Sequence, residues 1–173
     1  MKKTNSLYCI VGKSGTGKTT LALELEKLGF SVVESYTTRK PRFEGEKGHI
    51  FITEEEFDTL NLITKVEFDG NKYGVTSELL DKADIFVVDP EGLRILREQY
   101  NNKKIVAIYL DCPDDIIQQR MLQRGDSCEA VKQRILNDKD KFSLNTSYDF
   151  LFNIAETSLE EEVEYFVKYV VTS

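Results

Sequence analysis

The sequence has little of the material from which several common functional sites are built. It contains one histidine, three cysteines and no tryptophan in 173 residues. Because His49 is the sole imidazole, a site with several histidine ligands is excluded, and so is a Ser/His or Cys/His catalytic pair that does not use His49. Cys9, Cys112 and Cys128 are odd in number and include no C-x-x-C pair, so neither a disulfide framework nor a zinc site is expected. We therefore expect a cytoplasmic protein.

Long apolar runs are also missing. Stretches such as residues 105–110 are much too short to span a bilayer, and the apolar run near the start stops at Gly12, so we expect neither a membrane segment nor an export signal. Lysine and arginine number 23 against 30 acidic residues, a net charge of −7, which disfavours nonspecific binding to nucleic acid. An anionic small molecule therefore requires a local basic site.

Apolar periodicity predicts an α/β fold. No Pro/Gly/Ser-rich linker divides the chain, whose length suits one domain. Residues 6–11 predict a strand and 18–28 a helix, while the apolar runs at 84–89 and 104–111 predict buried parallel strands with crossover helices. Four further strands are predicted, at 31–34, 49–52, 63–68 and 150–154. A final helix is predicted from an apolar stripe consisting of Val163, Phe166, Val167 and Val170.

Residues 12–19 match the phosphate-binding pattern G-x-x-x-x-G-K-[ST], and they lie between a predicted strand and a predicted helix, as that pattern requires. Its glycines allow backbone N–H groups to curl around an anion at the positive end of the helix. Lys18 is expected to reach the β- and γ-phosphates of ATP, and Thr19 to bind Mg²⁺. The nucleotide-binding residues are predicted to be Gly12, Lys13, Ser14, Gly15, Thr16, Gly17, Lys18, Thr19 and Thr20.

This pattern does not by itself separate a kinase from a GTPase or a motor ATPase, which share the same phosphate cradle. Two later arginines narrow the choice. Arg39 and Arg42 are suited to gripping the oxygens of a second, smaller phosphate and to offsetting its repulsion of the incoming phosphoryl group. Asp89 ends a predicted strand where ligands gather in open α/β sheets, although helix capping before Pro90 is a strong alternative role.

The motifs together resemble the guanylate kinase family. Residues 35–46, which begin Ser-Tyr-Thr-Thr-Arg-Lys-Pro-Arg, are similar to its S-x-T-T-R-x-P-R-x-G-E signature. Residues 70–74 resemble its G-N-x-Y-G element, and residues 120–125 resemble its R-x-x-x-R-G lid. The resemblance implies an ATP-dependent nucleoside monophosphate kinase that converts GMP to GDP. The implied fold is a P-loop NTPase three-layer αβα domain with a mostly parallel sheet, a small β-rich acceptor-binding subdomain and a helical lid.

The resemblance also assigns segments and residues. It implies a core of about 1–34, 76–119 and 140–173, an acceptor-binding subdomain of about 35–75 and a lid of about 120–139. Lys18, Arg39, Arg124 and Arg134 are the implied catalytic residues, with Arg120 beside them in the lid. The implied acceptor-binding residues are Ser35, Arg39, Arg42, Tyr73 and Asp89. No general base is required, because the acceptor phosphate is already an anionic nucleophile.

The match is incomplete where the family reads the guanine base. Thr64 and Val75 stand where the family has a glutamate and a Ser or Thr, and His49 replaces a tyrosine that contacts the acceptor phosphate. Thr64 offers no carboxylate and Val75 no hydrogen bond, so relaxed specificity or another phosphorylated acceptor stays open. Ribose 1,5-bisphosphate phosphokinases, which carry similar residues at 49–50 and 73–75, are one alternative. A noncatalytic guanylate-kinase-like binding module is another, disfavoured by the complete phosphate-binding pattern.

Overall fold

The computed structural model describes residues 5–41, 43–68, 70–142 and 147–172. A parallel sheet with the strand order β6-β1-β7-β8 forms its centre. Its strands are β1 (Ser6–Gly12), β6 (Ile85–Val87), β7 (Lys104–Asp111) and β8 (Phe150–Asn153). The predicted parallel pairing of the strands near 84–89 and 104–111 is confirmed, since both lie directly beside β1.

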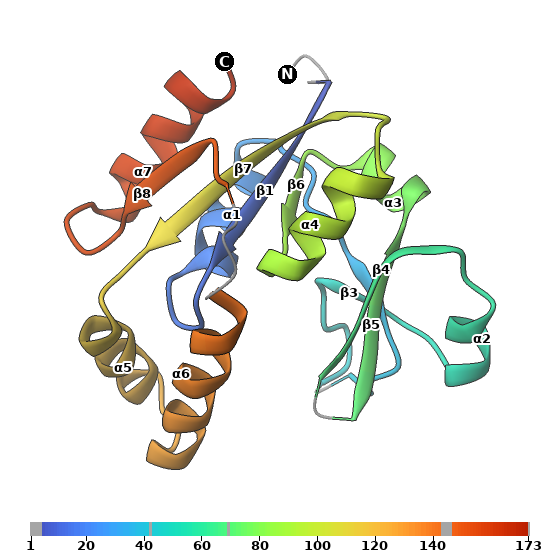
Figure 1. Ribbon diagram of the computed structural model, residues 1–173, viewed down its shortest axis with the longest axis horizontal. Helices are drawn as coiled ribbons and strands as arrows, with labels where there is room; N and C mark the ends of the chain where they lie inside the picture. The colour runs from blue at the N-terminus through green and yellow to red at the C-terminus, as the bar shows by residue number, and fades with distance from the viewer. Residues whose placement is uncertain (1–4, 42, 69, 143–146, 173) are drawn as a thin grey trace.

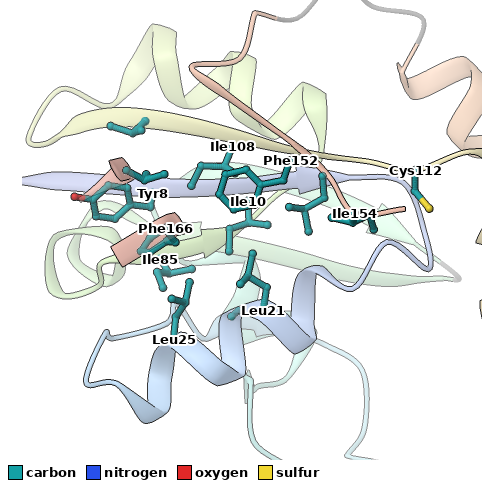
Figure 2. Packing of buried hydrophobic residues seen from close by; sticks show 14 of the residues in the cluster. Tyr8, Ile10, Leu21, Leu25, Ile85, Ile108, Cys112, Phe152, Ile154 and Phe166 are labelled. Atoms are coloured by element: carbon teal, nitrogen blue, oxygen red, sulfur yellow. The ribbon is translucent and has the colours of Figure 1, made fainter. Parts of the chain in front are cut away.

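Helices cover both faces of this sheet. Tyr8 and Ile10 point from β1 into a core shared with α1 (Lys18–Lys27), α5 (Asp114–Gln123) and the C-terminal helix, as Figure 2 shows. Leu7 and Cys9 point to the opposite face, where α3 (Ser77–Lys82) and α4 (Pro90–Gln99) pack. This alternation is the period of two expected of a strand, and it confirms the three-layer αβα arrangement.

A second sheet stands apart from the first and has the order β3-β2-β5-β4. It consists of β2 (Ser35–Thr37), β3 (His49–Phe51), β4 (Leu62–Phe68) and β5 (Asn71–Thr76). The short helix α2 (Glu54–Asp58) starts at a capping box between Thr53 and Glu56. Figure 1 shows this sheet and α2 on one side of the molecule, and the neighbouring helices α5 and α6 (Cys128–Phe142) on the other.

Two glycines mark where α1 starts and ends. Gly17, at a positive φ of 88°, precedes the first residue of α1, and Gly29, at 93°, ends that helix. The N–H groups of Gly29 and Phe30 donate to the carbonyls of Glu26 and Leu25, which is the Schellman pattern. The C-terminal end of α1 is therefore closed by backbone hydrogen bonds, whereas its N-terminal end, next to the phosphate-binding residues, has no side-chain cap.

Two elements predicted from the sequence are less regular in the structure. The strand predicted at 31–34 is reduced to one bridge between Val32 and Ile85, because only that residue pair meets the edge of β6. The C-terminal helix α7 (Leu159–Tyr165) continues as a π-helical turn, η1 (Phe166–Val170). Phe166 and Val170 are buried as predicted, but Val167 is 43% exposed, because a π turn spaces side chains more widely than the α period assumed.

The three cysteines differ in burial. Cys9 and Cys112 are buried and Cys128 is exposed, and all three are free thiols. Burial raises the pKa of Cys9 to about 12, so this thiol is unreactive near neutral pH. Among the residues described, no helix combines the length and apolar character needed to cross a membrane.

Candidate active site

The phosphate-binding turn runs from the end of β1 to the start of α1. Gly15 and Gly17 have positive φ values of 79° and 88°, a conformation that glycine adopts without strain. Gly12 is required for a different reason: a Cβ there would lie 2.7 Å from Thr16 Oγ1 and 2.9 Å from the carbonyl oxygen of Leu110. The glycines of the sequence pattern therefore shape the turn and allow β7 to approach it.

Lys18 folds back over this turn. Its Nζ donates hydrogen bonds to the carbonyl oxygens of Gly12 at 2.6 Å and Lys13 at 2.8 Å. Burial lowers the pKa of Lys18 to about 8, although the nearby carboxylates of Asp138 and Asp89 act in the opposite direction. A partly desolvated ammonium is a stronger electrostatic partner for a phosphate than an exposed one.

A cavity of about 360 Å³ opens beside the turn. One wall consists of residues 15–20, so six of the predicted nucleotide-binding residues line it. Arg120, Met121 and Arg124 from the α5 side form another wall, and Thr157, Leu159 and Glu162 complete the lining. We refer to it as the donor cavity.

The three remaining predicted nucleotide-binding residues do not line the donor cavity and instead contact neighbouring elements. Gly12 packs against β7, and Lys13 Nζ lies 2.7 Å from Asp114 Oδ1 at the start of α5. The backbone N–H of Ser14 donates to Asp138 Oδ2 on α6 at 2.6 Å. A carboxylate of the protein thus lies in the place where the backbone is shaped to receive an anion.

A second cavity, of about 490 Å³, lies between the second sheet and the ends of β6 and α4. Lys18 lines this cavity as well as the donor cavity, so its side chain stands where the two meet. Ser35, Tyr73 and Asp89, all predicted to bind the acceptor, are brought together in its wall. We refer to it as the acceptor cavity.

His49 lines the acceptor cavity, at the position where the family has a tyrosine that contacts the acceptor phosphate. Its Nδ1 lies 2.9 Å from Ser35 Oγ, because β2 and β3 pair in parallel with these two residues side by side. Its ring centroid is 5.7 Å from that of Tyr73. Three polar side chains from three strands therefore converge on one spot, and a small anion within the cavity has hydrogen-bonding groups available there.

Arg39 does not line either cavity. Its guanidinium forms a fork with Glu46, at 2.7 Å to Oε1 and 3.3 Å to Oε2, and it lies 5.3 Å from the centre of the Phe51 ring. The hydrogen bond to Glu46 raises the pKa of Arg39, and Tyr73 adds a smaller effect. The group therefore lies next to the cavity wall at Tyr73, held by an acidic partner. Arg42, the other predicted guanidinium, lies outside the described residues.

Asp89 has the capping role that competed with ligand binding in the sequence. Its Oδ1 accepts a hydrogen bond from the N–H of Gly92 at 2.8 Å, and Pro90 is the first residue of α4. Its Oδ2 lies 3.5 Å from Lys141 Nζ on α6. The carboxylate therefore caps the helix with one oxygen and faces the acceptor cavity, so the two roles are compatible.

The residues that replace the family's base-reading groups also lie in the acceptor cavity. Thr64 and Val75 are neighbours across the β4–β5 pair, with exposures of 9% and 0%. A buried valine offers an apolar wall, and the threonine hydroxyl offers one donor and two acceptor lone pairs. This end of the cavity therefore has fewer hydrogen-bonding groups than the family pattern implies.

Two of the three predicted lid arginines line the donor cavity, and the third does not. Arg120 and Arg124 line the donor cavity, where Arg120 donates to the carbonyl oxygen of Ile154 at 3.1 Å and Arg124 pairs with Asp126. Arg134 is half-buried on α6 and lines neither cavity. The predicted catalytic group is therefore only partly assembled, with Lys18 and Arg124 at the donor side.

The described residues contain no cluster of three or more metal-ligating His, Cys, Asp or Glu side chains. Thr19, the predicted magnesium ligand, is exposed at the second residue of α1 and lines the donor cavity. Because Mg²⁺ commonly keeps water and substrate phosphates as most of its ligands, one hydroxyl at the rim of a phosphate site fits this ion.

Sequence reasoning missed Asp138 and Lys141 and assigned no role to His49. The two α6 residues are three positions apart, so they share a face that meets the phosphate-binding turn through Asp138 and the acceptor cavity through Lys141. In the sequence they belong to a charged run, residues 138–141, which is typical of a solvated helix surface. A helical projection of residues 128–142 shows that Asp138 and Lys141 share a face, but it does not show that they contact Ser14 and Asp89.

Comparisons with known proteins show which family the chain resembles. A family model described as an AAA domain matches residues 9–141. The guanylate kinase of Campylobacter jejuni subsp. jejuni serotype O:2 is 33% identical, over 87% of this chain and 81% of that protein. Guanylate kinases of Helicobacter pylori strain 26695 and Thermotoga maritima are 34% and 31% identical, covering 92% and 95% of this chain and 83% and 85% of their own lengths.

Solved structures resemble the fold. A guanylate kinase from Anaplasma phagocytophilum superposes with a TM-score of 0.65 at 20% identity, covering 99% of this chain and 87% of that one. A sugar kinase from Janibacter sp. HTCC2649 gives a TM-score of 0.55 at 16% identity, covering 96% and 94%. At these identities the likeness concerns the fold alone.

Proposed function

Because this chain belongs to the guanylate kinase family, we propose that it transfers the γ-phosphoryl group of ATP to GMP, forming ADP and GDP. The observation that carries the proposal is the position of Lys18, whose side chain lines both the donor and the acceptor cavity. A phosphoryl group that passes between two bound phosphates must cross such a junction. The similarity to guanylate kinases over most of the chain favours GMP over ribose bisphosphate as the acceptor. It also favours an enzyme over a noncatalytic binding module.

The transfer needs position and positive charge more than acid–base chemistry. An oxygen lone pair of the acceptor phosphate forms the new bond to the γ-phosphorus, and the bond between that phosphorus and the β,γ-bridging oxygen breaks. The electrons of that bond remain on the ADP β-phosphate, so no proton has to move. Lys18 is placed to stabilise the charge on the group in transit.

The turn and the lid supply the donor side of the proposal. Backbone N–H groups of residues 13–18 would bind the phosphates of ATP, and Arg124 would approach from the lid. Mg²⁺, held by Thr19 and the phosphates, would neutralise charge on the β- and γ-oxygens. Arg134 reaches this place only if α6 moves toward the turn, in keeping with a lid of about 120–139 that closes on the nucleotide; α6 itself continues to Phe142.

The second sheet supplies the acceptor side, and the proposed subdomain is about 35–75, with the core formed by about 1–34, 76–119 and 140–173. Ser35 and Tyr73 would bind the acceptor phosphate with their hydroxyl groups. Arg39, with Arg42, would grip it once the fork to Glu46 opens or the phosphate joins it. Asp89 would meet the base from the end of β6.

A coupled ADP-release assay over GMP, dGMP, AMP, UMP, CMP and ribose 1,5-bisphosphate tests the proposal. We expect GMP and dGMP to stimulate release most. In Lys18→Ala we expect turnover to fall about a hundredfold or more, because the charge at the junction is lost. ATP binding without stimulation by any of the six acceptors would contradict the kinase and favour a binding module.

A further inference from the structure

The acceptor cavity contains a lysine that no motif assigns. Lys141 is the second-last residue of α6 and lines this cavity together with Lys18, Ser35 and Tyr73. Its Nζ lies 3.5 Å from Asp89 Oδ2, and 44% of its side chain is exposed. A single, partly exposed contact of this length holds a lysine weakly, so the ammonium is available to a stronger anion.

The other cations near this cavity are already engaged. Of the lysines in its wall, Lys18 donates to two carbonyls of the phosphate-binding turn, and Lys65 places its Nζ 5.6 Å from the centre of the Phe57 ring. Arg39 is held by Glu46. Among the described residues, Lys141 is therefore the lysine of this cavity wall that pairs with a carboxylate, that of Asp89, and it does so at 3.5 Å.

The position of Lys141 in the wall of the acceptor cavity, which Lys18 also lines, determines what it can bind. Lys18 and Lys141 line the same cavity, and the charge of Lys141 makes a small contribution to the lowered pKa of Lys18. Two neighbouring cations repel one another, and a phosphate between them relieves that repulsion. A phosphomonoester in the acceptor cavity would have Ser35 and Tyr73 on the side of the second sheet and Lys141 on the side of α6.

We propose that Lys141 is an acceptor-binding residue, whose ammonium leaves Asp89 and binds the phosphate of the acceptor on the side that faces ATP. The proposal rests on the proposed function, because it supplies a further contact to the same acceptor. It makes α6 a part of both half-sites, with Asp138 at the donor turn and Lys141 at the acceptor. The contact recognises the phosphate and is indifferent to the base.

Lys141→Met tests this, because methionine keeps most of the length and removes the charge. Lys141→Arg keeps the charge, and Lys139→Met is the matched control, since Lys139 is an exposed lysine of the same helix that does not line the cavity. Affinities for GMP and for guanosine are measured by calorimetry without ATP. We expect Lys141→Met to weaken GMP about tenfold and to leave guanosine unchanged. Lys141→Arg and Lys139→Met should bind GMP within about threefold of the unaltered protein.

The outcomes separate Lys141 from the function of the enzyme. If GMP and guanosine weaken together in Lys141→Met, the lysine only maintains the cavity; if neither weakens, it does not bind acceptor. Either result overturns the proposal while GMP-stimulated ADP release by the unaltered protein leaves the kinase function intact. If the unaltered protein releases no ADP with GMP, the function fails, and the ratio of GMP to guanosine affinity still decides the role of Lys141.

Discussion

The carboxylate of Asp138 lies 2.6 Å from the backbone nitrogen of Ser14, within the turn shaped to receive the phosphates of ATP. The N–H that donates to this carboxylate is one of the groups that a phosphate would use. A triphosphate and a carboxylate also repel one another at this range. Binding of ATP therefore requires the side-chain carboxylate of Asp138 to leave this nitrogen.

Asp138→Asn should tighten the binding of ATP. The amide has nearly the same shape but no negative charge, so the nucleotide displaces a weaker partner, and we expect the dissociation constant for ATP to fall about tenfold. Calorimetry with a non-hydrolysable ATP analogue measures it. Glu129→Gln, a neutralisation at the exposed start of α6, is the control and should have no effect. Weaker or equal ATP binding in Asp138→Asn would show that the carboxylate does not compete with the phosphates.

The depressed pKa of Lys18 predicts a loss of ATP use at alkaline pH. In the free enzyme this group titrates at about 8, well below an exposed lysine, because it is largely desolvated. Below that pH the ammonium is charged and attracts phosphate; above it the amine is neutral. We expect kcat/KM for ATP to fall about tenfold per pH unit above the pKa, and kcat to fall at higher pH because bound phosphates stabilise the charged form.

Lys18→Arg provides the control for this profile, because a guanidinium does not titrate in the range. Whatever activity this variant keeps should lack the alkaline decline. A kcat/KM for ATP in the unaltered enzyme that stays level through pH 9.5 would contradict the assignment of the group.

The fork between Arg39 and Glu46 predicts different effects from its two halves. Arg39→Ala removes the acceptor-binding charge and leaves a carboxylate only 9% exposed without that partner, so both turnover and Tm should fall. Glu46→Gln should lower Tm less and raise KM for GMP, because the guanidinium loses its orientation. Steady-state kinetics and thermal unfolding measure both. Full turnover in Arg39→Ala would remove Arg39 from the acceptor site.

Thr64→Glu should sharpen the choice of base. The family reads guanine with a carboxylate at this position, and Thr64 lines the acceptor cavity. A glutamate there can accept two N–H groups of guanine, which adenine does not present in the same pattern. We expect the ratio of kcat/KM for GMP over AMP to rise about tenfold. Thr59→Glu, an exposed change just after α2, is the control. An unchanged ratio would mean that the base lies elsewhere.

The local chemistry of the donor side could be predicted from the sequence, since the turn is contiguous and its neighbours carry strong periodic signals. Residues 15–20 line the donor cavity, and the strand at 104–111 has the bounds expected. Ser35, Tyr73 and Asp89 also meet as the family pattern implies. The conformation of the turn is fixed locally by its short motif, whereas the meeting of Ser35, Tyr73 and Asp89 was expected from the family resemblance.

The contacts of α6 with Asp89 and Ser14 could not be predicted in this way. They join residues that are 52 and 124 positions apart in the sequence, and the packing of the helix determines them. The link from Ser14 to Asp138 spans 124 positions, and nothing near either residue indicates it. Likewise, the sequence shows that Arg39 is basic but not that Glu46 holds it. Side-chain partners depend on how the layers pack, which short motifs do not determine.

The burial of two of the three cysteines leaves the chain with one accessible thiol, which lies where a label can report on α6. Cys128 begins α6, the helix whose far end carries Asp138 and Lys141, while Cys9 and Cys112 are enclosed in the core. A maleimide fluorophore would therefore attach at a single position on the proposed lid without any engineered mutation. Its emission offers a direct optical record of how fast the helix responds when each nucleotide is added.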